Sequence, residues 1–485
     1  MKVLYRSIVV LLVLLVIVVS SCTKNMTTLN VNPKVDTIVQ GETLFSNGEL
    51  ALANNLVTPN VNVGIFELIA QYWAETTYPQ ESQYDLGNRD IALNFWNAMY
   101  RDVIMDFDRS IQLMRVQAAS PTLLESEKAA YTNKIAIAKI MRAYSFSILV
   151  NTFGDIPYTQ ALQGRENTTP AYDNQKDVYY ALLDTISTSI SELDLTSGGF
   201  GNADLIYGGD VEKWYKFANS IQLKLGMIIA DVDPETAKAK VLTAVQNGVF
   251  TSNADNALLN YTTTPPNVNP IWTNLVQSGR NDFVAANTIV DTMNAHNDPR
   301  LPFYFSEGPN GGYIGGIYGS GNRFANFSHP SDQVEAADFP AIIMDYAEVE
   351  FLLAEAAARG MGVTGSAVQH YNNAVTASIT FWGGTTEQAA SYLANPKNQF
   401  DASNWKKSIG VQQWIAYYTR GFDAWISFRR LDYPQLKAPP SAVTPFPMRY
   451  TYPSTEPNLN SANYNTAASS IGGDAVTTKL FWDVH

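Results

Sequence analysis

The sequence contains a single cysteine in 485 residues and four histidines that lie far apart. One cysteine excludes a disulfide framework and a cysteine-based metal cluster. Charged residues make up only 16% of the chain, and the 45 acidic residues outnumber the 32 basic ones, which gives a formal charge of −13. This acidic surplus argues against nucleic-acid binding, because phosphate contacts need lysine and arginine. The 46% hydrophobic content excludes a disordered chain.

Sequence signatures of several enzyme classes are also missing. The chain has neither HExxH nor G-x-S-x-G, which mark zinc proteases and α/β-hydrolases. The glycine-rich stretch 308–321 is not a phosphate-binding loop, because Asn322 stands where that motif requires lysine. Two carboxylates can converge from anywhere in the chain, so glycoside hydrolysis stays open as an alternative. We expect a protein that is not an enzyme and has neither a cofactor nor a metal site.

The N-terminus is typical of a secretory signal. Lys2 and Arg6 precede an uncharged apolar run at residues 8–19, which is too short for a membrane-spanning helix of roughly 20 residues. We therefore predict a signal peptide at residues 1–21. Its removal takes away two basic residues and no acid, so the mature charge is −13 − 2 = −15.

The signal ends in Ser20-Ser21-Cys22, which resembles a bacterial lipobox. There the signal is cleaved before the cysteine and the thiol is lipidated, and the only cysteine of the chain stands at this point. Acyl chains contribute about 0.8 kcal/mol per buried methylene, so several chains anchor a protein firmly. No later stretch approaches 18 consecutive apolar residues. We expect a protein that is attached to a membrane through Cys22 and does not span it.

The rest of the chain divides into a tether at residues 22–41 and one large domain at residues 42–485. The tether is polar and has no helical periodicity. In the domain, apolar residues recur at helical spacing, as in Val178, Leu182, Ile186 and Ile190. The same analysis predicts helices at residues 127–151, 177–193, 212–230, 345–359, 366–381 and 405–430, the last interrupted near Gly421. Paired helices of this kind are similar to tetratricopeptide repeats, so the predicted fold is mainly α with little strand.

Long irregular segments separate these helices, at residues 74–92, 251–285, 302–340 and 433–485, and they are rich in Gly, Pro, Asn, Tyr and Trp. Loops of that length inside a domain are usually functional. Aromatic side chains offer a flat apolar face and, in Tyr and Trp, a polar group, which suits the two-faced ring of a sugar. The ligand-binding candidates in these loops are Trp73, Tyr78, Tyr84, Trp272, Tyr313, Tyr318 and Arg323.

These candidates have a plainer alternative, which is that the rings belong to the core. This alternative applies mainly to Trp73 and Trp272. Tyr78, Tyr84, Tyr313 and Tyr318 stand beside polar residues or glycine, so we expect them to be less buried.

Six short motifs occur in a fixed order along the mature chain. They are Leu29-Asn30-Val31-Asn32-Pro33, Ala143-Tyr144 with Phe153-Gly154-Asp155-Ile156-Pro157-Tyr158, Asn297-Asp298-Pro299-Arg300-Leu301-Pro302, Ala347 to Ala356, Gly421-Phe422-Asp423-Ala424-Trp425 with Arg429-Arg430 and Tyr433-Pro434, and Pro447-Met448-Arg449 through Tyr452-Pro453, Glu456 and Asn458. In this order, behind a lipobox, they make the chain resemble the SusD/RagB family of nutrient-binding outer-membrane lipoproteins of Bacteroidetes.

The resemblance implies a helical fold with tetratricopeptide-like units and a partner, a SusC-like TonB-dependent barrel transporter. It also implies a lipid-anchored protein of the outer membrane that faces the cell exterior. One departure is that residues 23–28 contain no acid, whereas exported lipoproteins of this group often carry acidic residues there. We expect most of the matching motifs to be structural. Asp155 would cap a helix or form a turn, and Pro157 would stop a helix. Glu348, Glu350 and Glu355 would form a solvated or ion-paired face, and Arg429 and Arg430 would pair with acids or cap carbonyls.

The leading hypothesis from the sequence is therefore capture of a glycan for a transporter. Capture of peptides by the same kind of protein is the second hypothesis. A lipid-anchored glycan hydrolase and a purely structural interaction module are the alternatives from other classes.

Overall fold

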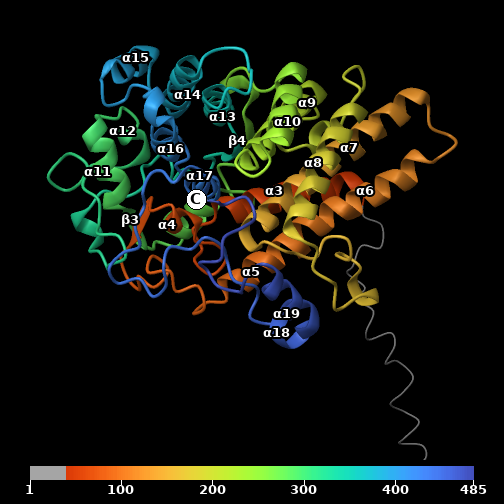
Figure 1. Cartoon of the computed structure of the whole chain (residues 1–485), viewed down its shortest axis with the longest axis horizontal. Helices are drawn as coiled ribbons and strands as arrows, with labels where there is room; N and C mark the ends of the chain where they lie inside the picture. The colour runs from red at the N-terminus through yellow and green to blue at the C-terminus, as the bar shows by residue number, and fades with distance from the viewer. Residues whose placement is uncertain (1–39, 485) are drawn as a thin grey trace, which may run out of the picture. The chain divides into compact units, whose positions relative to one another are not determined.

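Residues 40–484 are described by a computed structural model, and helices account for most of them (Figure 1). The predicted signal peptide, the lipidated Cys22 and nearly all of the tether lie outside the described residues. Residues 41–485 form one unit. No helix within the described part is both long enough and apolar enough to cross a bilayer.

The α-helices in chain order are α3 (Gly41–Val57), α4 (Phe66–Ile69), α5 (Ile91–Asn97), α6 (Met105–Ala118), α7 (Glu125–Phe153), α8 (Gln175–Glu192), α9 (Val211–Ile228), α10 (Pro234–Asn247), α11 (Asn287–His296), α12 (Leu301–Tyr304), α13 (Tyr346–Ala358), α14 (Ala367–Trp382), α15 (Thr386–Ala394), α16 (Trp405–Ala416), α17 (Gly421–Leu431), α18 (Glu456–Leu459) and α19 (Ser461–Ser470). Two π-helices, η1 (Ala98–Ile104) and η5 (Trp272–Gln277), join them. Each helix predicted from periodicity is present, and the last is split between α16 and α17 as expected.

Local capping sets where several of these helices begin. The side chains of Asp210, Asp345 and Ser366 each accept a hydrogen bond from a backbone N–H in the first turn of α9, α13 and α14, which satisfies a donor that the helix leaves free. At the other end of α7, Gly154 adopts a φ of 90°. Asp155 accepts a hydrogen bond from Gln175 N at 2.8 Å, so the segment after α7 caps the start of α8, as the motif suggested.

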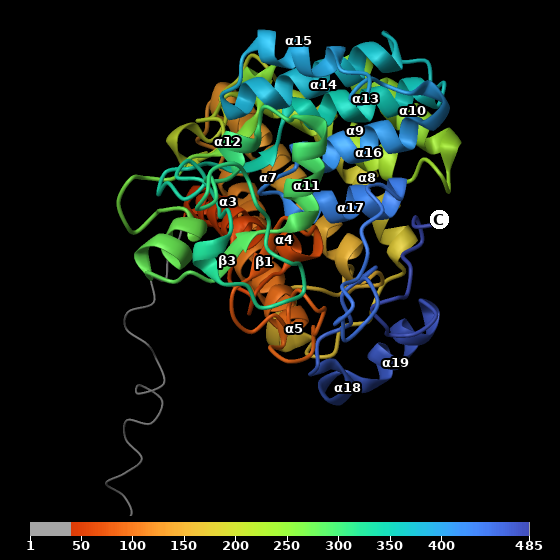
Figure 2. The same ribbon diagram turned by 90° about the vertical axis from the view of Figure 1, so that its left-hand side faces the viewer.

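Successive helices pack in pairs, among them α6 with α7, α7 with α8, α9 with α10 and α13 with α14. These pairs agree with the predicted tetratricopeptide-like arrangement. Within this unit, α9, α10, α13 and α14 lie toward one end, and the strands β1 and β3 lie with α5 toward the other (Figure 2). The helix pairs α9–α10 and α13–α14 thus lie away from the end of the unit where β1 and β3 pair.

Strands are few, as predicted, and form two small antiparallel sheets. Strand β1 (Trp73–Glu75) pairs with β3 (Phe283–Ala285), and β2 (Ala257–Leu259) pairs with β4 (Ala341–Met344). Both pairings join segments that are far apart in the sequence. They fasten the long loops to one another and to the helical scaffold.

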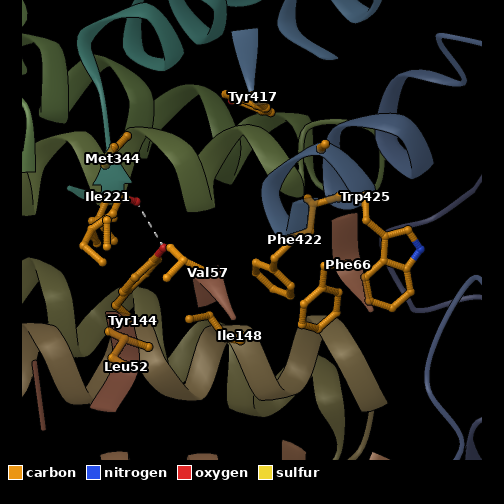
Figure 3. Close-up of a cluster of buried hydrophobic side chains, with 14 of the residues drawn as sticks. Leu52, Val57, Phe66, Tyr144, Ile148, Ile221, Met344, Tyr417, Phe422 and Trp425 are labelled. Atoms are coloured by element: carbon orange, nitrogen blue, oxygen red, sulfur yellow. Dashed lines mark hydrogen bonds between the residues drawn. The ribbon is translucent and has the colours of Figure 1, made fainter. Parts of the chain in front are cut away.

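The hydrophobic core forms where the helices meet the loops. Figure 3 shows side chains from α3, α4, α7, α9 and α17 in contact there, including Phe66, Tyr144 and Trp425. The rings of Phe66 and Tyr450 stack at 5.4 Å. A Cβ on Gly421 would lie 2.4 Å from the backbone carbon of Phe66. Only glycine therefore allows α17 to approach α4 this closely.

The charged residues of the matching motifs are buried and paired. Glu348 is 1% exposed and contacts Lys224 at 2.9 Å and Arg420. Arg430 contacts Glu355, and Arg429 donates to the carbonyl oxygen of Met448 at 2.7 Å. These residues hold the scaffold together, because a buried charge is tolerated only when it is paired. The expectation that these side chains form ion pairs or cap carbonyls is confirmed.

Candidate functional site

The β1–β3 pair brings the early aromatic segment and the middle one together. Trp73 lies opposite Ala285 and Glu75 opposite Phe283. Beyond the strands, Thr76 N donates to Asp282 O at 2.9 Å, and its hydroxyl donates to Asn281 O at 2.5 Å across a sequence separation of 205. The two regions that the sequence singled out separately therefore form one structural unit.

A cleft of about 340 Å³ opens at the end of this strand pair. Its walls come from the turn at residues 59–62, from residues 75–89 and from residues 273–283. We refer to it below as the cleft. Its lining is mixed, with a tyrosine, a phenylalanine, three asparagines, three hydroxyl side chains and five charged side chains. Such a surface offers both an apolar face and many hydrogen-bonding groups to a ligand.

Tyr78 is the aromatic ring that stands out from the wall of the cleft. It is 67% exposed, and its φ is 59°, in the left-handed region that a bulky residue seldom adopts. Four of the eight described non-glycine residues with positive φ lie between residues 71 and 90. Strained backbone of this kind concentrates at functional sites. The opposite wall includes the π-helix η5, another feature that is common at such sites.

The floor of the cleft carries two glutamates in contact with each other. Glu75 Oε2 accepts hydrogen bonds from Ser82 N at 2.9 Å and from the Ser82 hydroxyl, and Glu81 Oε1 contacts Arg89 Nε. Burial, together with a hydrogen bond between the two carboxyl groups, raises the pKa of Glu75 to about 8. Glu75 therefore holds a proton at neutral pH, because two neighbouring buried carboxylates repel each other.

A second ion pair and several amides line the upper part of the cleft. Arg280 Nε donates to Asp282 Oδ2 at 2.7 Å, and both side chains are partly exposed. The asparagines are Asn60, Asn62 and Asn274. The backbone N–H of Asn62 donates to Asn60 Oδ1 at 3.1 Å, and this hydrogen bond holds Asn62 in place. Amide and hydroxyl groups at these positions can hydrogen-bond the hydroxyls of a bound molecule.

Trp73 lies behind the cleft and supports it. It is 1% exposed, its ring lies 5.4 Å from the ring of Phe283, and its Nε1 donates to the Tyr418 hydroxyl at 3.0 Å. Phe283 in turn lines the cleft. The sequence left open the alternative that Trp73 belongs to the core, and the structure places it there. Trp73 holds a wall of the cleft in place through Phe283.

Tyr84 and Tyr318 are buried, so the expectation that they would be less buried is wrong. They are 0% and 7% exposed. Gln71 Nε2 donates to the Tyr84 hydroxyl at 3.0 Å, and the Tyr318 hydroxyl donates to Leu68 O at 2.5 Å. Their rings pack beneath the loops, so their faces are covered by protein. The polar residues and glycines next to these tyrosines in the sequence do not determine their burial, because other segments of the chain fold over the rings.

The other three candidates do not line the cleft. Trp272 begins η5 and is half-buried, Tyr313 is half-buried, and Arg323 is exposed. Tyr313 contributes its carbonyl oxygen to a hydrogen bond from Asn294 at 3.1 Å. Of the seven predicted ligand-binding residues, the structure places only Tyr78 in the wall of the cleft.

Sequence reasoning missed the charged side chains of the cleft. Glu75, Glu81, Arg89, Arg280 and Asp282 all line it, and none was selected. One signal was available, because residues 75–89 contain four charged side chains and residues 280–282 contain two, in a chain that is poor in charge. In the described residues, no group of three or more histidine, cysteine or acidic side chains is arranged to hold a metal ion.

A helical scaffold that presents an open, polar cleft with an exposed ring defines a ligand-binding protein. The chain belongs to the SusD-like family: the family model described as "Starch-binding associating with outer membrane" matches residues 33–453. No curated protein sequence matches the chain. The resemblance drawn from the six motifs is thus confirmed at the level of the family.

Solved structures agree with this assignment. A structure described as a chitin-binding protein is 27% identical, with a TM-score of 0.80, and the match covers 92% of this chain and all of that one. A chitin-binding SusD homologue from Flavobacterium johnsoniae is 26% identical, with a TM-score of 0.74 over 91% of this chain and 99% of its own. A SusD homologue from Bacteroides uniformis has 26% identity and a TM-score of 0.77, over 91% and 99% of the two chains.

Proposed function

We propose that this protein binds an oligosaccharide in the cleft and delivers it to a SusC-like, TonB-dependent transporter at the outer membrane. The observation that carries the proposal is the cleft itself, where Tyr78 stands 67% exposed beside asparagine and hydroxyl side chains. The SusD-like family and the chitin-binding relatives support a glycan as the ligand. The protein acts by binding and leaves the bonds of the glycan intact.

Each part of the cleft has a role in this proposal. The face of Tyr78 stacks on the apolar C–H face of a sugar ring, a contact on the order of 1 kcal/mol by analogy with aromatic pairs. Asn60, Asn62 and Asn274 hydrogen-bond the hydroxyls at the edge of the ring. Phe283 and the backbone of β1 and β3 provide a rigid base, because both strands belong to a sheet. Trp272, Tyr313 and Arg323 stay outside this set.

Attachment to the membrane is a further part of the proposal. It rests on the signal peptide predicted at residues 1–21 and on lipidation at Cys22. A lipid anchor would keep the binding protein next to the transporter that receives its ligand. Mass spectrometry of the mature protein would find an acylated N-terminal cysteine, and an unmodified Cys22 would contradict this part.

Calorimetry on the purified protein tests the binding proposal. We would titrate uncharged oligosaccharides of N-acetylglucosamine, α-1,4-glucose and β-1,4-glucose, and a mixture of short peptides. At least one oligosaccharide should bind, and Tyr78→Ala should weaken that binding about ten-fold, which corresponds to about 1.4 kcal/mol. Tyr131→Ala is the matched control, since Tyr131 lies on α7 and does not line the cleft.

The alternatives appear as distinct outcomes of this experiment. Binding of peptides without binding of any oligosaccharide would favour peptide capture. New reducing ends that accumulate during incubation with an oligosaccharide would show a hydrolase and would contradict the binding role. An equal loss of affinity in both tyrosine variants would mean that the ligand does not bind in the cleft.

A further inference from the structure

The cleft is lined by charged groups of both signs, and their net charge depends on one proton. Three carboxyl groups and two guanidinium groups line it. They are Glu75, Glu81, Asp282, Arg89 and Arg280. The balance depends on how these five groups are paired and on whether one carboxyl group holds a proton.

Both guanidinium groups are already engaged. Arg89 contacts Glu81 on the floor, and Arg280 contacts Asp282 at 2.7 Å on the rim. Within residues 40–484, Glu75 forms no ion pair. Its Oε2 instead takes two hydrogen bonds from Ser82. The five groups thus divide into two ion pairs and one carboxyl group without a cation.

The geometry around the third carboxyl group favours its neutral form. Glu75 is 3% exposed and Glu81 is 0% exposed. Glu81 Oε2 is buried, and no other donor in the described part of the chain reaches it, so a proton on Glu75 is the donor available to satisfy it. The raised pKa of Glu75, caused by burial and by its hydrogen bond with Glu81, agrees with this arrangement. With that proton in place, two negative and two positive charges remain.

We propose that the cleft binds uncharged oligosaccharides and discriminates against oligosaccharides that carry carboxylate or ammonium groups. This inference rests on the proposed function. A charged sugar loses hydration when it enters the cleft and finds no free counter-charge there. To pair with it, an existing ion pair would have to open, which leaves another charge unpaired. Specificity of this kind arises from the cost imposed on the wrong ligand.

The experiment compares oligosaccharides of equal length and different charge. The uncharged probes are the hexamers of N-acetylglucosamine, α-1,4-glucose and β-1,4-glucose, and the charged probes are the hexamers of glucosamine and galacturonate. Calorimetry would be done at about pH 5.5 and low ionic strength, because salt screens exposed charges. The best uncharged hexamer should bind at least about ten-fold more tightly than either charged one.

Two substitutions at the rim provide a matched pair, each of which should raise affinity for a hexamer of opposite charge. Arg280→Gln frees Asp282, so affinity for the glucosamine hexamer should rise about three-fold. Asp282→Asn frees Arg280, so affinity for the galacturonate hexamer should rise by a similar factor. Both side chains are partly exposed, so neither change threatens folding. A charged hexamer that binds the unmodified protein as tightly as the best uncharged one would overturn the inference, as would a gain in affinity for the same charged hexamer in both variants.

The pH profile gives a third measurement. The titratable and charged groups around Glu75 are Glu81 and Arg89 on the segment that follows β1, Tyr318 from the segment between α12 and β4, and Arg280 and Asp282 on the rim. Affinity for the uncharged hexamer should fall as the pH rises through about 8, where Glu75 loses its proton. Glu75→Gln should abolish that fall, and an identical profile in the variant would contradict the inference.

Failure of this inference is distinguishable from failure of the proposed function. If no hexamer binds the unmodified protein, the proposed glycan-binding function fails, and the inference fails with it. If hexamers bind without regard to their charge, the cleft still binds glycans and only the inference about charge is wrong.

Discussion

Tyr78 and Tyr84 lie six residues apart in one segment and have opposite surroundings. Both have a positive φ, 59° and 63°. Tyr78 is 67% exposed in the wall of the cleft, whereas Tyr84 is 0% exposed. The same residue type, in the same backbone region and with similar neighbours, therefore serves the binding surface in one case and the core in the other.

The C-terminal segment makes the difference. The ring of Phe446 meets that of Tyr84 edge-on at 5.6 Å, the Thr444 hydroxyl donates to Tyr84 O at 3.0 Å, and Val443 N donates to Gln83 O at 2.7 Å. This segment covers Tyr84 but not Tyr78. The comparison teaches that exposure of a ring in a long loop is decided by distant parts of the chain.

The largest expected effect is that of Tyr84→Ala. Removing a buried ring costs about 3–5 kcal/mol through lost contacts and the cavity that remains. Urea unfolding would measure the loss of stability. Tyr84→Phe keeps the ring and loses the hydrogen bonds of the hydroxyl with Gln71 and Tyr318, so it should cost about 1–2 kcal/mol. A cost below about 1 kcal/mol for Tyr84→Ala would mean that the ring is not part of the core.

The second effect concerns Glu75, on the strand that leads into this segment. Its pKa is about 8 in the folded protein and 4.5 as the ordinary value, so the folded state holds the proton more tightly than the unfolded chain. The stability that this proton contributes is complete below about pH 4.5 and is lost as the pH rises toward 8. Glu75→Gln should gain at least about 1 kcal/mol relative to the unmodified protein between about pH 5 and pH 8.

Urea unfolding at several pH values would measure this difference. Glu125→Gln is the control, because Glu125 is exposed at the start of α7, and its curve should stay parallel to that of the unmodified protein. A Glu75→Gln curve that is parallel as well would show that the folded state leaves the proton affinity of Glu75 unchanged.

The smallest expected effect on stability is that of Tyr78→Ala. Because the ring is largely exposed, its removal should change the free energy of unfolding by no more than about 0.5 kcal/mol. The same variant should lose glycan affinity, as described above. Together with Tyr84→Ala, it would separate binding from stability within one segment. A large loss of stability in Tyr78→Ala would mean that the Tyr78 ring, like that of Tyr84, belongs to the core.

Much of the scaffold was predictable from the sequence. Helices α7, α8, α9, α13 and α14 follow from apolar periodicity, and polar side chains cap the starts of the last four; both are local properties of the chain. Arg430 was expected to pair with an acid or to cap carbonyls, and Glu355 to lie on a solvated or ion-paired face; the structure pairs the two with each other. The helix predictions succeeded because a helix is stabilised by contacts among residues three and four positions apart.

The site was predicted only in part. The sequence pointed to the early and the middle aromatic segments, and the β1–β3 pair joins them. Within those segments it selected by residue type, so it chose Tyr84 and Tyr318 and passed over Glu75 and Phe283. Residue type indicates what a side chain is able to do, but not which distant segment covers it.

Local periodicity in the chain was therefore enough to specify a helical scaffold, and the resemblance of six ordered motifs was enough to indicate the family. Tertiary structure alone decided which rings face solvent, that Glu75 and Glu81 lie buried together at the cleft, and that residues 59–62, 75–89 and 273–283 form one cleft. The physical reason is that helix formation depends on neighbours in sequence, whereas burial, exposure and charge pairing depend on neighbours in space.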